Sequence, residues 1–230
     1  MTGGAPDLAT IAPQVVACRA CPRLVAWREQ VGREKRRAFR DEQYWAAPVP
    51  GFGDPRARLL VVGLAPAAHG ANRTGRVFTG DRSGEWLFRA LHRAGFAKQS
   101  TSEHRGDGLR LRDAWVTAAV KCAPPANRPL PEERDRCEPF LHAEAAALPR
   151  LRVVLALGGF AWRSALRLLD AQEVALPRPL PRFGHGAEWT GGGTTLIGSY
   201  HPSQQNTFTG RLTEPMFEEV FALARGILDD

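Results

Sequence analysis

The chain has 230 residues, of which 43% are hydrophobic and 24% charged, and this composition indicates a globular protein with a sizeable core. No apolar run approaches the roughly 20 residues of a membrane-spanning helix, and residues 1–12 lack the pattern of a signal peptide. We therefore expect a cytoplasmic protein with no membrane partner. The net charge of +7 favours a polyanionic partner such as nucleic acid, although an arginine-rich composition alone produces the same charge.

The predicted elements alternate between helices and strands. Apolar spacing predicts a helical segment over 7–34, interrupted near Cys21, and then further helices over 84–94, 132–148, 161–169 and 213–227. Strands are predicted over 58–64, 114–121, 153–157 and 194–199, whereas residues 178–193 are predicted to be irregular. This alternation implies βαβ units, so we expect one monomeric α/β domain over 1–230, with a mainly parallel sheet between two layers of helices.

A strongly basic segment follows the first helical region. It contains Arg33, Lys35, Arg36, Arg37 and Arg40. A run of this kind is either a solvated helix face or a contact for DNA, and the sequence leaves both open.

Four cysteines form two pairs that are distant in the chain. Two residues separate Cys18 from Cys21, and fourteen separate Cys122 from Cys137. In a cytosolic protein of this size, such a set indicates a metal site rather than two disulfides. Four thiolates suit a [4Fe–4S] cluster and a structural zinc ion equally well, and the spacing does not distinguish them.

The loop from Gly63 to Asp81 is longer than a bare connection, which needs about two to six residues. It leaves the carboxyl end of a strand, where α/β proteins bind ligands. Phe78, which we expect to be exposed among glycines and polar residues, either anchors the loop or offers a flat face for stacking a base. Asp81 is either a carboxylate at the mouth of the sheet or the N-cap of the next helix.

Two further loops that follow strands carry polar side chains. Asn127 lies in a proline-rich loop, where its amide can read a base edge or orient water, or can simply form a turn. His201 directly follows the last strand and either donates to a leaving group that gains negative charge or bonds the backbone. Because parallel strands end at one edge of the sheet, we expect Phe78, Asp81, Asn127 and His201 to line one cleft.

The segment after His201 is a candidate contact for DNA. It is polar with one aromatic residue, and such a loop can enter a duplex and hold the gap left by an extruded nucleotide. It can equally be an ordinary surface connection. The candidate contacts are Ser203, Gln205, Asn206 and Arg211.

These segments resemble the iron–sulfur uracil-DNA glycosylases of bacteria and archaea, and among them family 5, also called type b. The resemblance rests on residues 63–81, 121–128 and 201–208 and on the cysteine spacing, and it covers nearly the whole chain. It implies a bacterial repair enzyme with a four-stranded parallel sheet between helices, which hydrolyses the N-glycosidic bond of uracil in DNA. It also implies a structural [4Fe–4S] cluster bound by Cys18, Cys21, Cys122 and Cys137.

Within this resemblance each candidate residue has an expected role. The extruded base stacks on Phe78, His201 hydrogen-bonds the base as it leaves, and Asp81 balances the cationic sugar or orients water. Asn127 orients water or contacts the base. The backbone donors around the base belong to Gly63, Leu64, Ala65 and Ala67.

Two positions depart from related families. Leu64 stands where many uracil glycosylases have Asp, Asn or Glu to position the attacking water, and Ala118 stands where family 4 has an Asn that reads uracil. Resemblance to family 5 therefore implies a looser pocket, which also accepts deaminated or damaged bases such as hypoxanthine and ethenocytosine.

Two other functions remain open at this stage. The first is a DNA-binding module with a structural metal and no catalysis. The second is a different base-excision or nuclease activity on the same scaffold, because fold does not determine function. The sequence has no cluster of Asp and Glu suited to a two-metal site, which argues against a nuclease.

Overall fold

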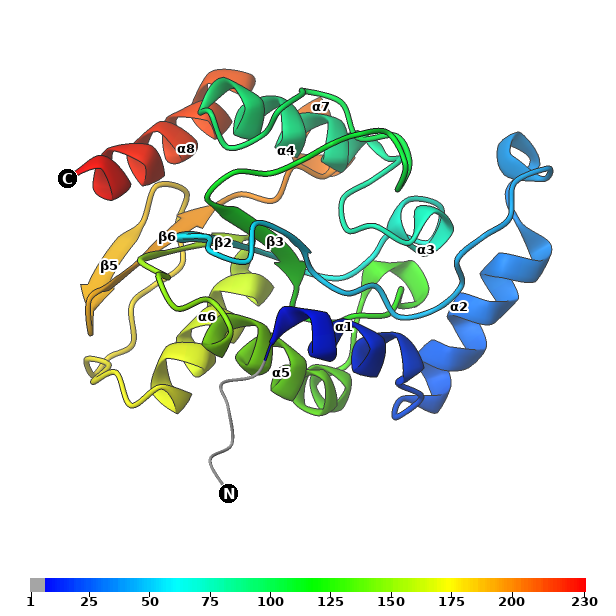
Figure 1. Ribbon diagram of the computed structural model, residues 1–230, viewed down its shortest axis with the longest axis horizontal. Coiled ribbons are helices and arrows are strands. Elements are labelled where there is room, and N and C mark those ends of the chain that lie inside the picture. The colour runs from blue at the N-terminus through cyan, green and yellow to red at the C-terminus, as the bar shows by residue number, and fades with distance from the viewer. Residues whose placement is uncertain (1–6) are drawn as a thin grey trace.

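A computed structural model describes residues 7–230, in which six strands form one sheet covered by helices on both faces (Figure 1). The strand order across the sheet is β1-β3-β2-β4-β6-β5. The strands are β1 (Phe52–Gly53), β2 (Leu59–Gly63), β3 (Ala114–Ala118), β4 (Val153–Leu157), β5 (Glu188–Gly191) and β6 (Thr194–Ser199).

The four inner strands β3, β2, β4 and β6 are parallel, whereas β1 and β5 pair antiparallel at the two edges. The predicted three-layer α/β/α sandwich around four parallel strands is therefore confirmed, and two short edge strands extend it. The prediction that residues 178–193 are irregular is partly wrong, because β5 forms a hairpin with β6. Gly192 and Gly193 make this turn with φ of 58° and 78°, which glycine adopts without steric cost.

The predicted helices are present, with ends shifted by a few residues. The predicted helical segment 7–34 is two helices with Cys18 and Cys21 at the junction, because Cys18 caps the end of the first and Cys21 the start of the second. The α-helices are α1 (Leu8–Ala17), α2 (Pro22–Glu34), α3 (Ala71–Thr74), α4 (Arg82–Arg93), α5 (Pro131–Ala146), α6 (Gly159–Ala171), α7 (Gln204–Phe208) and α8 (Glu214–Asp229). Two short 3-10 helices span Arg37–Phe39 and Pro125–Asn127.

Side chains of each inner strand alternate between two hydrophobic cores. From β2, Leu59 and Val61 pack with α4 and α8, while Leu60 and Val62 pack with α1, α5 and α6. Figure 1 shows these two groups of helices on opposite sides of the sheet. Because both faces are covered, every residue of β2 is buried, which explains the unbroken apolar run in the sequence.

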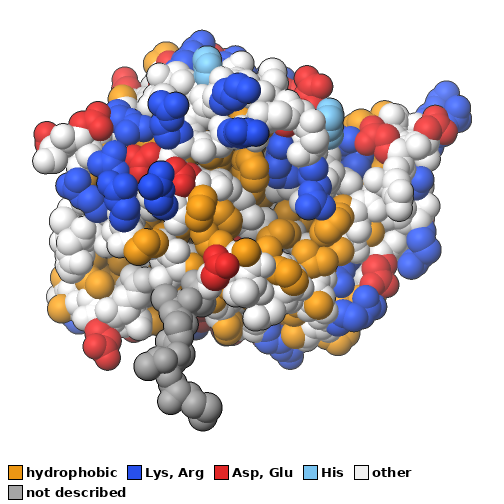
Figure 2. Space-filling model, in the orientation of Figure 1, with side chains coloured by type: hydrophobic (Ala, Val, Ile, Leu, Met, Phe, Trp, Pro, Cys, Tyr) orange, Lys and Arg blue, Asp and Glu red, His pale blue; other side chains and the backbone are white. Residues whose placement is uncertain are grey.

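The surface of the molecule is strongly but unevenly charged. Figure 2 shows Lys and Arg side chains over much of one face, interrupted by a band of hydrophobic atoms. No helix within residues 7–230 is both long and apolar enough to cross a membrane.

Candidate active site

A cleft of about 810 Å³ opens at the carboxyl edge of the parallel strands. Its walls come from the loop after β2, the turn after β3 and the segment after β6, together with the basic segment that follows α2. The cleft brings together the four side chains expected at one site, and they are Phe78, Asp81, Asn127 and His201.

Phe78 is buried rather than exposed, so that part of the sequence prediction is wrong. It retains 9% of its accessible surface and belongs to the core shared by β2 and α4. Its ring lies against the backbone of Gly63, where an added Cβ would stand 2.5 Å from a ring carbon. Gly63 therefore does not line the cleft; it leaves the space that the ring of Phe78 occupies. The ring centroid lies 5.9 Å from that of His201, with the two planes tilted by 31°.

Asp81 caps the N-terminus of α4 and also lines the cleft. The two positions considered from the sequence, a helix cap and a carboxylate at the mouth of the sheet, therefore occur together. The Oδ1 of Asp81 accepts a hydrogen bond from the backbone N–H of Gly84 at 2.9 Å, which caps α4. Its Oδ2 packs against Gly70, where an added Cβ would stand 2.0 Å from that oxygen. Burial raises the pKa of Asp81, while hydrogen bonds from the amides of Gly84 and Ser83 and the charge of Arg73 oppose that rise.

His201 directly follows β6 and faces the ring of Phe78. Burial lowers the pKa of His201 to about 4, so its imidazole is neutral at physiological pH and carries one N–H donor and one acceptor. Its backbone carbonyl accepts hydrogen bonds from the side-chain amide of Asn206 and from the backbone of Ser203, each at 2.8 Å. These contacts hold the residue in place, and its ring remains available to a ligand.

Asn127 lies at the exposed rim of the cleft, in the turn after β3. Both Ala126 and Asn127 have positive φ, of 52° and 54°, and such a conformation is uncommon for a residue other than glycine. Asn tolerates this region better than most residues because its short side chain bonds locally. The side chain of Asn127 has no hydrogen bond to another described residue and lines the cleft.

The other predicted contacts divide into two groups. Leu64, Ala65 and Ala67 line the cleft, and Ser203 and Gln205 lie at its mouth. The remaining two predicted DNA contacts, Asn206 and Arg211, are absent from its lining.

Both of these residues have contacts within the protein. Asn206 bonds the backbone of His201, and the guanidinium of Arg211 lies 4.6 Å from the ring centroid of Tyr200. Their assignment as DNA contacts stays a prediction.

Several residues of the cleft were not predicted from the sequence. His69 hydrogen-bonds the hydroxyl of Tyr44 at 3.0 Å, and burial lowers its pKa. Two cationic side chains that the sequence analysis did not single out, Arg82 and Arg128, also reach the cleft. Arg36, from the basic segment considered there as a solvated face or a contact for DNA, lines the cleft as well.

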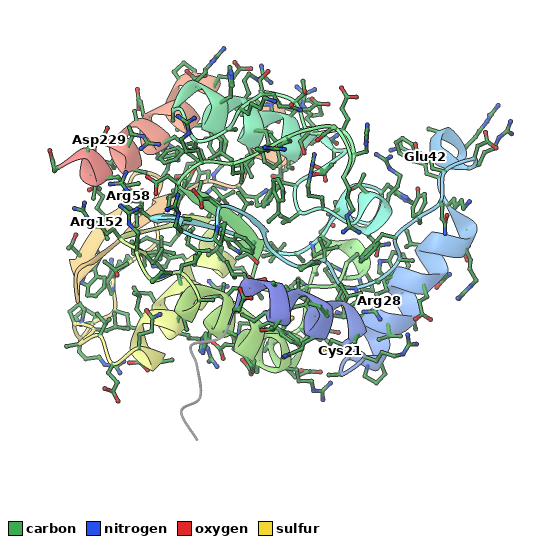
Figure 3. All side chains as sticks on the ribbon, viewed as in Figure 1. Cys21, Arg28, Glu42, Arg58, Arg152 and Asp229 are labelled. Atoms are coloured by element: carbon green, nitrogen blue, oxygen red, sulfur yellow. The ribbon has the colours of Figure 1, made fainter. Side chains whose placement is uncertain are left out.

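The four cysteines converge on one small pocket beside the cleft. Cys18 is half-buried, the other three are buried, and no disulfide joins them. Figure 3 shows Cys21 and Arg28 along α2, with Glu42 beyond the far end of that helix. Within residues 7–230, no set of three or more His, Cys, Asp and Glu side chains is already arranged as metal ligands.

The chemistry around these thiols nevertheless fits a group bound by four thiolates. Arg28 is buried and donates from Nη1 to the Sγ of Cys122 at 2.9 Å, and the backbone N–H of Lys121 donates to the Sγ of Cys137 at 3.1 Å. The Nε of Arg28 is buried with no partner among the described residues. Such donors stabilise thiolate sulfur in iron–sulfur and zinc sites.

The cysteine pocket and the cleft share structural elements. Ala65 lines the cleft and also packs against the cluster formed by the cysteines, Leu24 and Val120. The carbonyl of Arg28 accepts a hydrogen bond from the side chain of Asn72, a fully buried residue of the loop after β2. Ala65 therefore connects the cysteine pocket directly to the wall of the cleft.

Comparison with known proteins agrees with this geometry. The family model described as the uracil DNA glycosylase superfamily matches residues 50–225. The chain belongs to this superfamily. Most of the cleft lies within the matched region, whereas Arg36 and Phe39 of its wall and Cys18 and Cys21 precede it.

Full-length relatives extend the match across the N-terminal cysteines. A type-5 uracil-DNA glycosylase of Mycobacterium tuberculosis (strain CDC 1551 / Oshkosh) is 54% identical over 227 residues, which are 98% of this chain and 83% of the relative. One from Thermus thermophilus is 53% identical over 212 residues, 92% and 94% of the two chains. A type-4 uracil-DNA glycosylase of Archaeoglobus fulgidus is 31% identical over 156 residues, 67% and 70% of the two chains. The expected relation to family 5 is confirmed.

Proposed function

We propose that this protein is a DNA glycosylase that hydrolyses the N-glycosidic bond of uracil in DNA and leaves an abasic site for base excision repair. The observation that carries the proposal is the single cleft in which Phe78, Asp81, Asn127 and His201 meet. Type-5 relatives that match nearly the whole chain support it.

DNA binding begins with the phosphates. Arg36, Arg82 and Arg128 surround the cleft and offer positive charge to a strand that enters it. The target nucleotide leaves the base stack, because its glycosidic bond is inaccessible within a duplex. Phe208 of α7 is 66% exposed, with the guanidinium of Arg82 4.7 Å from its ring centroid, and it is the apolar side chain best placed to fill the gap in the stack.

The extruded base lies on the exposed edge of Phe78, against the segment Leu64–Ala67. The side chains of Leu64, Ala65 and Ala67 are apolar, so recognition in this region depends on backbone groups. Ala118 is buried at the end of β3 and cannot hydrogen-bond a base through its side chain. We therefore propose that hypoxanthine and ethenocytosine are accepted in addition to uracil.

Bond cleavage separates charge between sugar and base. The neutral imidazole of His201 donates an N–H to the base oxygen that gains negative charge. The carboxylate of Asp81 balances the cationic sugar or orients the attacking water, while its bond to Gly84 holds it in place. Asn127, at the rim, orients water or contacts the base.

The four cysteines are proposed to hold a [4Fe–4S] cluster. When bound, it supplies a structural crosslink between the α1–α2 junction, the turn after β3 and α5. Arg28 and the backbone of Lys121 donate to the sulfur atoms of Cys122 and Cys137. Holding these segments together supports the wall of the cleft at Ala65.

We further propose that residues 1–230 act as one monomeric domain in the bacterial cytoplasm, at the chromosomal DNA. Residues 1–6 of that domain lie outside the described residues. The proposed DNA substrate and the bacterial relatives support the location.

The test is excision from a single-uracil oligonucleotide followed by alkaline cleavage. We expect one cleavage product at the uracil, unchanged by EDTA, and weaker binding as salt increases. Binding without excision would instead identify a DNA-binding module, and cleavage without alkali that requires a divalent metal would identify a nuclease. Substrates with hypoxanthine, xanthine or ethenocytosine opposite each normal base then measure the breadth of the pocket.

A further inference from the structure

Arg73, in the short helix α3, contacts two separate points of the loop that carries Asp81. Its side chain is only 9% exposed. Nε donates to the carbonyl of His69 at 2.8 Å, and Nη2 donates to the carbonyl of Gly80 at 3.0 Å. These two carbonyls belong to residues next to Gly70 and Asp81, which pack against each other.

The rest of the guanidinium is held from the opposite side. Nη1 forms an ion pair with Glu42, and the ring of Phe39 lies 4.0 Å from the guanidinium carbon. Phe39 also lines the cleft. All three nitrogens and one planar face of Arg73 are thus engaged, and only a planar fork of donors can reach these partners together.

Gly80 leaves the space that the guanidinium of Arg73 occupies. Its φ of 77° is in the left-handed region, and an added Cβ would stand 2.5 Å from Nη2 of Arg73. A larger residue at this position would therefore push the guanidinium away and move the backbone that leads into Asp81. The contact between Arg73 and Gly80 depends on the absence of a side chain there.

We propose that Arg73 is a positioning residue for the reaction, which fixes the Asp81 carboxylate against Gly70 by joining the carbonyls of His69 and Gly80. This inference rests on the proposed function, because it gives Asp81 a role in the reaction. Arg73 does not line the cleft, and its hydrogen bonds reach the backbone of the loop rather than Asp81 itself. A displacement of about 1 Å at a reacting group can cost roughly 100-fold in rate.

The experiment measures single-turnover excision and DNA affinity for Arg73→Met and Arg73→Lys. We expect both variants to slow the excision step by about tenfold to 100-fold while the Kd for DNA stays within about twofold. Lys retains the charge but not the fork, so it should not restore the rate. A rate equal to wild type in either variant would overturn the proposal.

Arg89→Met is the matched control. Arg89 shares a second cavity with Arg73 and Asp81, but its guanidinium pairs with Glu214 of α8 at 2.8 Å and holds no part of the loop. Removing its charge should leave the excision rate within about twofold of wild type. An equal loss in Arg73→Met and Arg89→Met would mean that charge, not positioning, is responsible.

A double-mutant cycle separates this proposal from the proposed function. In an Asp81→Asn background, Arg73→Met should cause little further loss, because the two residues act as a unit. Losses that add would overturn the positioning role while leaving the glycosylase assignment intact. A wild-type protein without excision would instead contradict the proposed function itself. If Arg73→Met does not fold, Glu42→Gln removes one anchor of the same guanidinium and should give a smaller loss of the same kind.

Discussion

The cleft and the cysteine pocket are both assembled from distant segments, but they differ in openness. The cleft has a volume of about 810 Å³, whereas the cysteine pocket has only about 10 Å³. The cleft is lined by residues in uncommon backbone conformations, such as Phe78 and Asn127. The cysteine pocket is lined by four thiols, and donors to two of them, Cys122 and Cys137, are already in place.

This difference indicates which measurements each region controls. A wide cleft accommodates an exchanging ligand, so substitutions there should change rates more than stability. A closed pocket of thiols suits a group that stays bound, so substitutions there should change stability and composition first. The following variants test this division between the two regions.

The largest effect is expected for Asp81→Asn, with excision slowed by roughly 100-fold or more. Asn is as good an N-cap as Asp, so α4 should remain capped and the melting temperature should change little. Asp81→Ala removes the cap as well and should additionally cost about 1 kcal/mol of stability. Single-turnover excision and thermal unfolding of both variants separate the two roles, and wild-type turnover in Asp81→Asn would remove the carboxylate from the mechanism.

His201→Ala should lose at least roughly tenfold in excision, because a donor to the leaving base disappears. The fold should persist, since the backbone contacts of His201 with Asn206 and Ser203 do not involve its ring. Single-turnover rates and circular dichroism check this expectation. Excision at the wild-type rate would mean that another group stabilises the leaving base.

Cys122→Ser should lower the iron content and the brown absorbance at about 400 nm, and it should lower the melting temperature. Excision should decline less than in Asp81→Asn, because no step of the reaction uses the thiols and the cysteine pocket affects the cleft only through its wall at Ala65. Metal analysis, absorbance and melting curves test this. Colourless wild-type protein with one zinc ion would replace the cluster by a structural zinc site.

The pH dependence of stability should change in His201→Gln. Because burial lowers the pKa of His201 from 6.5 to about 4, the unfolded chain binds its proton first on acidification. Stability from the neutral ring is therefore complete above pH 6.5 and is lost as the pH falls towards 4. Urea unfolding across that range should show a shallower pH slope in His201→Gln, and an unchanged slope would mean that the ring is solvated.

The smallest effect is expected for Arg28→Met. This variant keeps all four cysteines but removes the donor to the Cys122 sulfur. The reduction potential of the bound group and the fraction of protein that retains it should therefore change. Excision should fall less than in Asp81→Asn. Arg19→Met is the control, since Arg19 pairs with Glu29 at 2.7 Å on the exposed side of the same segment. Equal behaviour of the two variants would show that the donor has no influence on the pocket.

The inner strands could be predicted from sequence because burial on both faces demands continuous apolar runs, and residues 153–157 and 194–199 match β4 and β6. The edge strand β1 has two residues and β5 is half-exposed, so neither has such a pattern. The cluster of candidate residues could also be predicted, because parallel strands end at one edge.

The direction in which each side chain points could not be predicted from the sequence. Phe78 is buried because Gly63 leaves room for its ring, and Asn206 turns inward to the backbone of His201. Arg73 is one arginine among many in the chain, and only its position between two carbonyls distinguishes it.

By itself, the sequence determined the layers of the fold, the pairing of cysteines into one set and the edge of the sheet where ligands bind. These follow from local periodicity and from the topology of parallel strands. Tertiary structure alone decided which polar groups face the cleft and which hydrogen-bond the protein's own backbone. The reason is that these contacts join residues far apart in the chain, and their formation depends on angles and distances that no local pattern encodes.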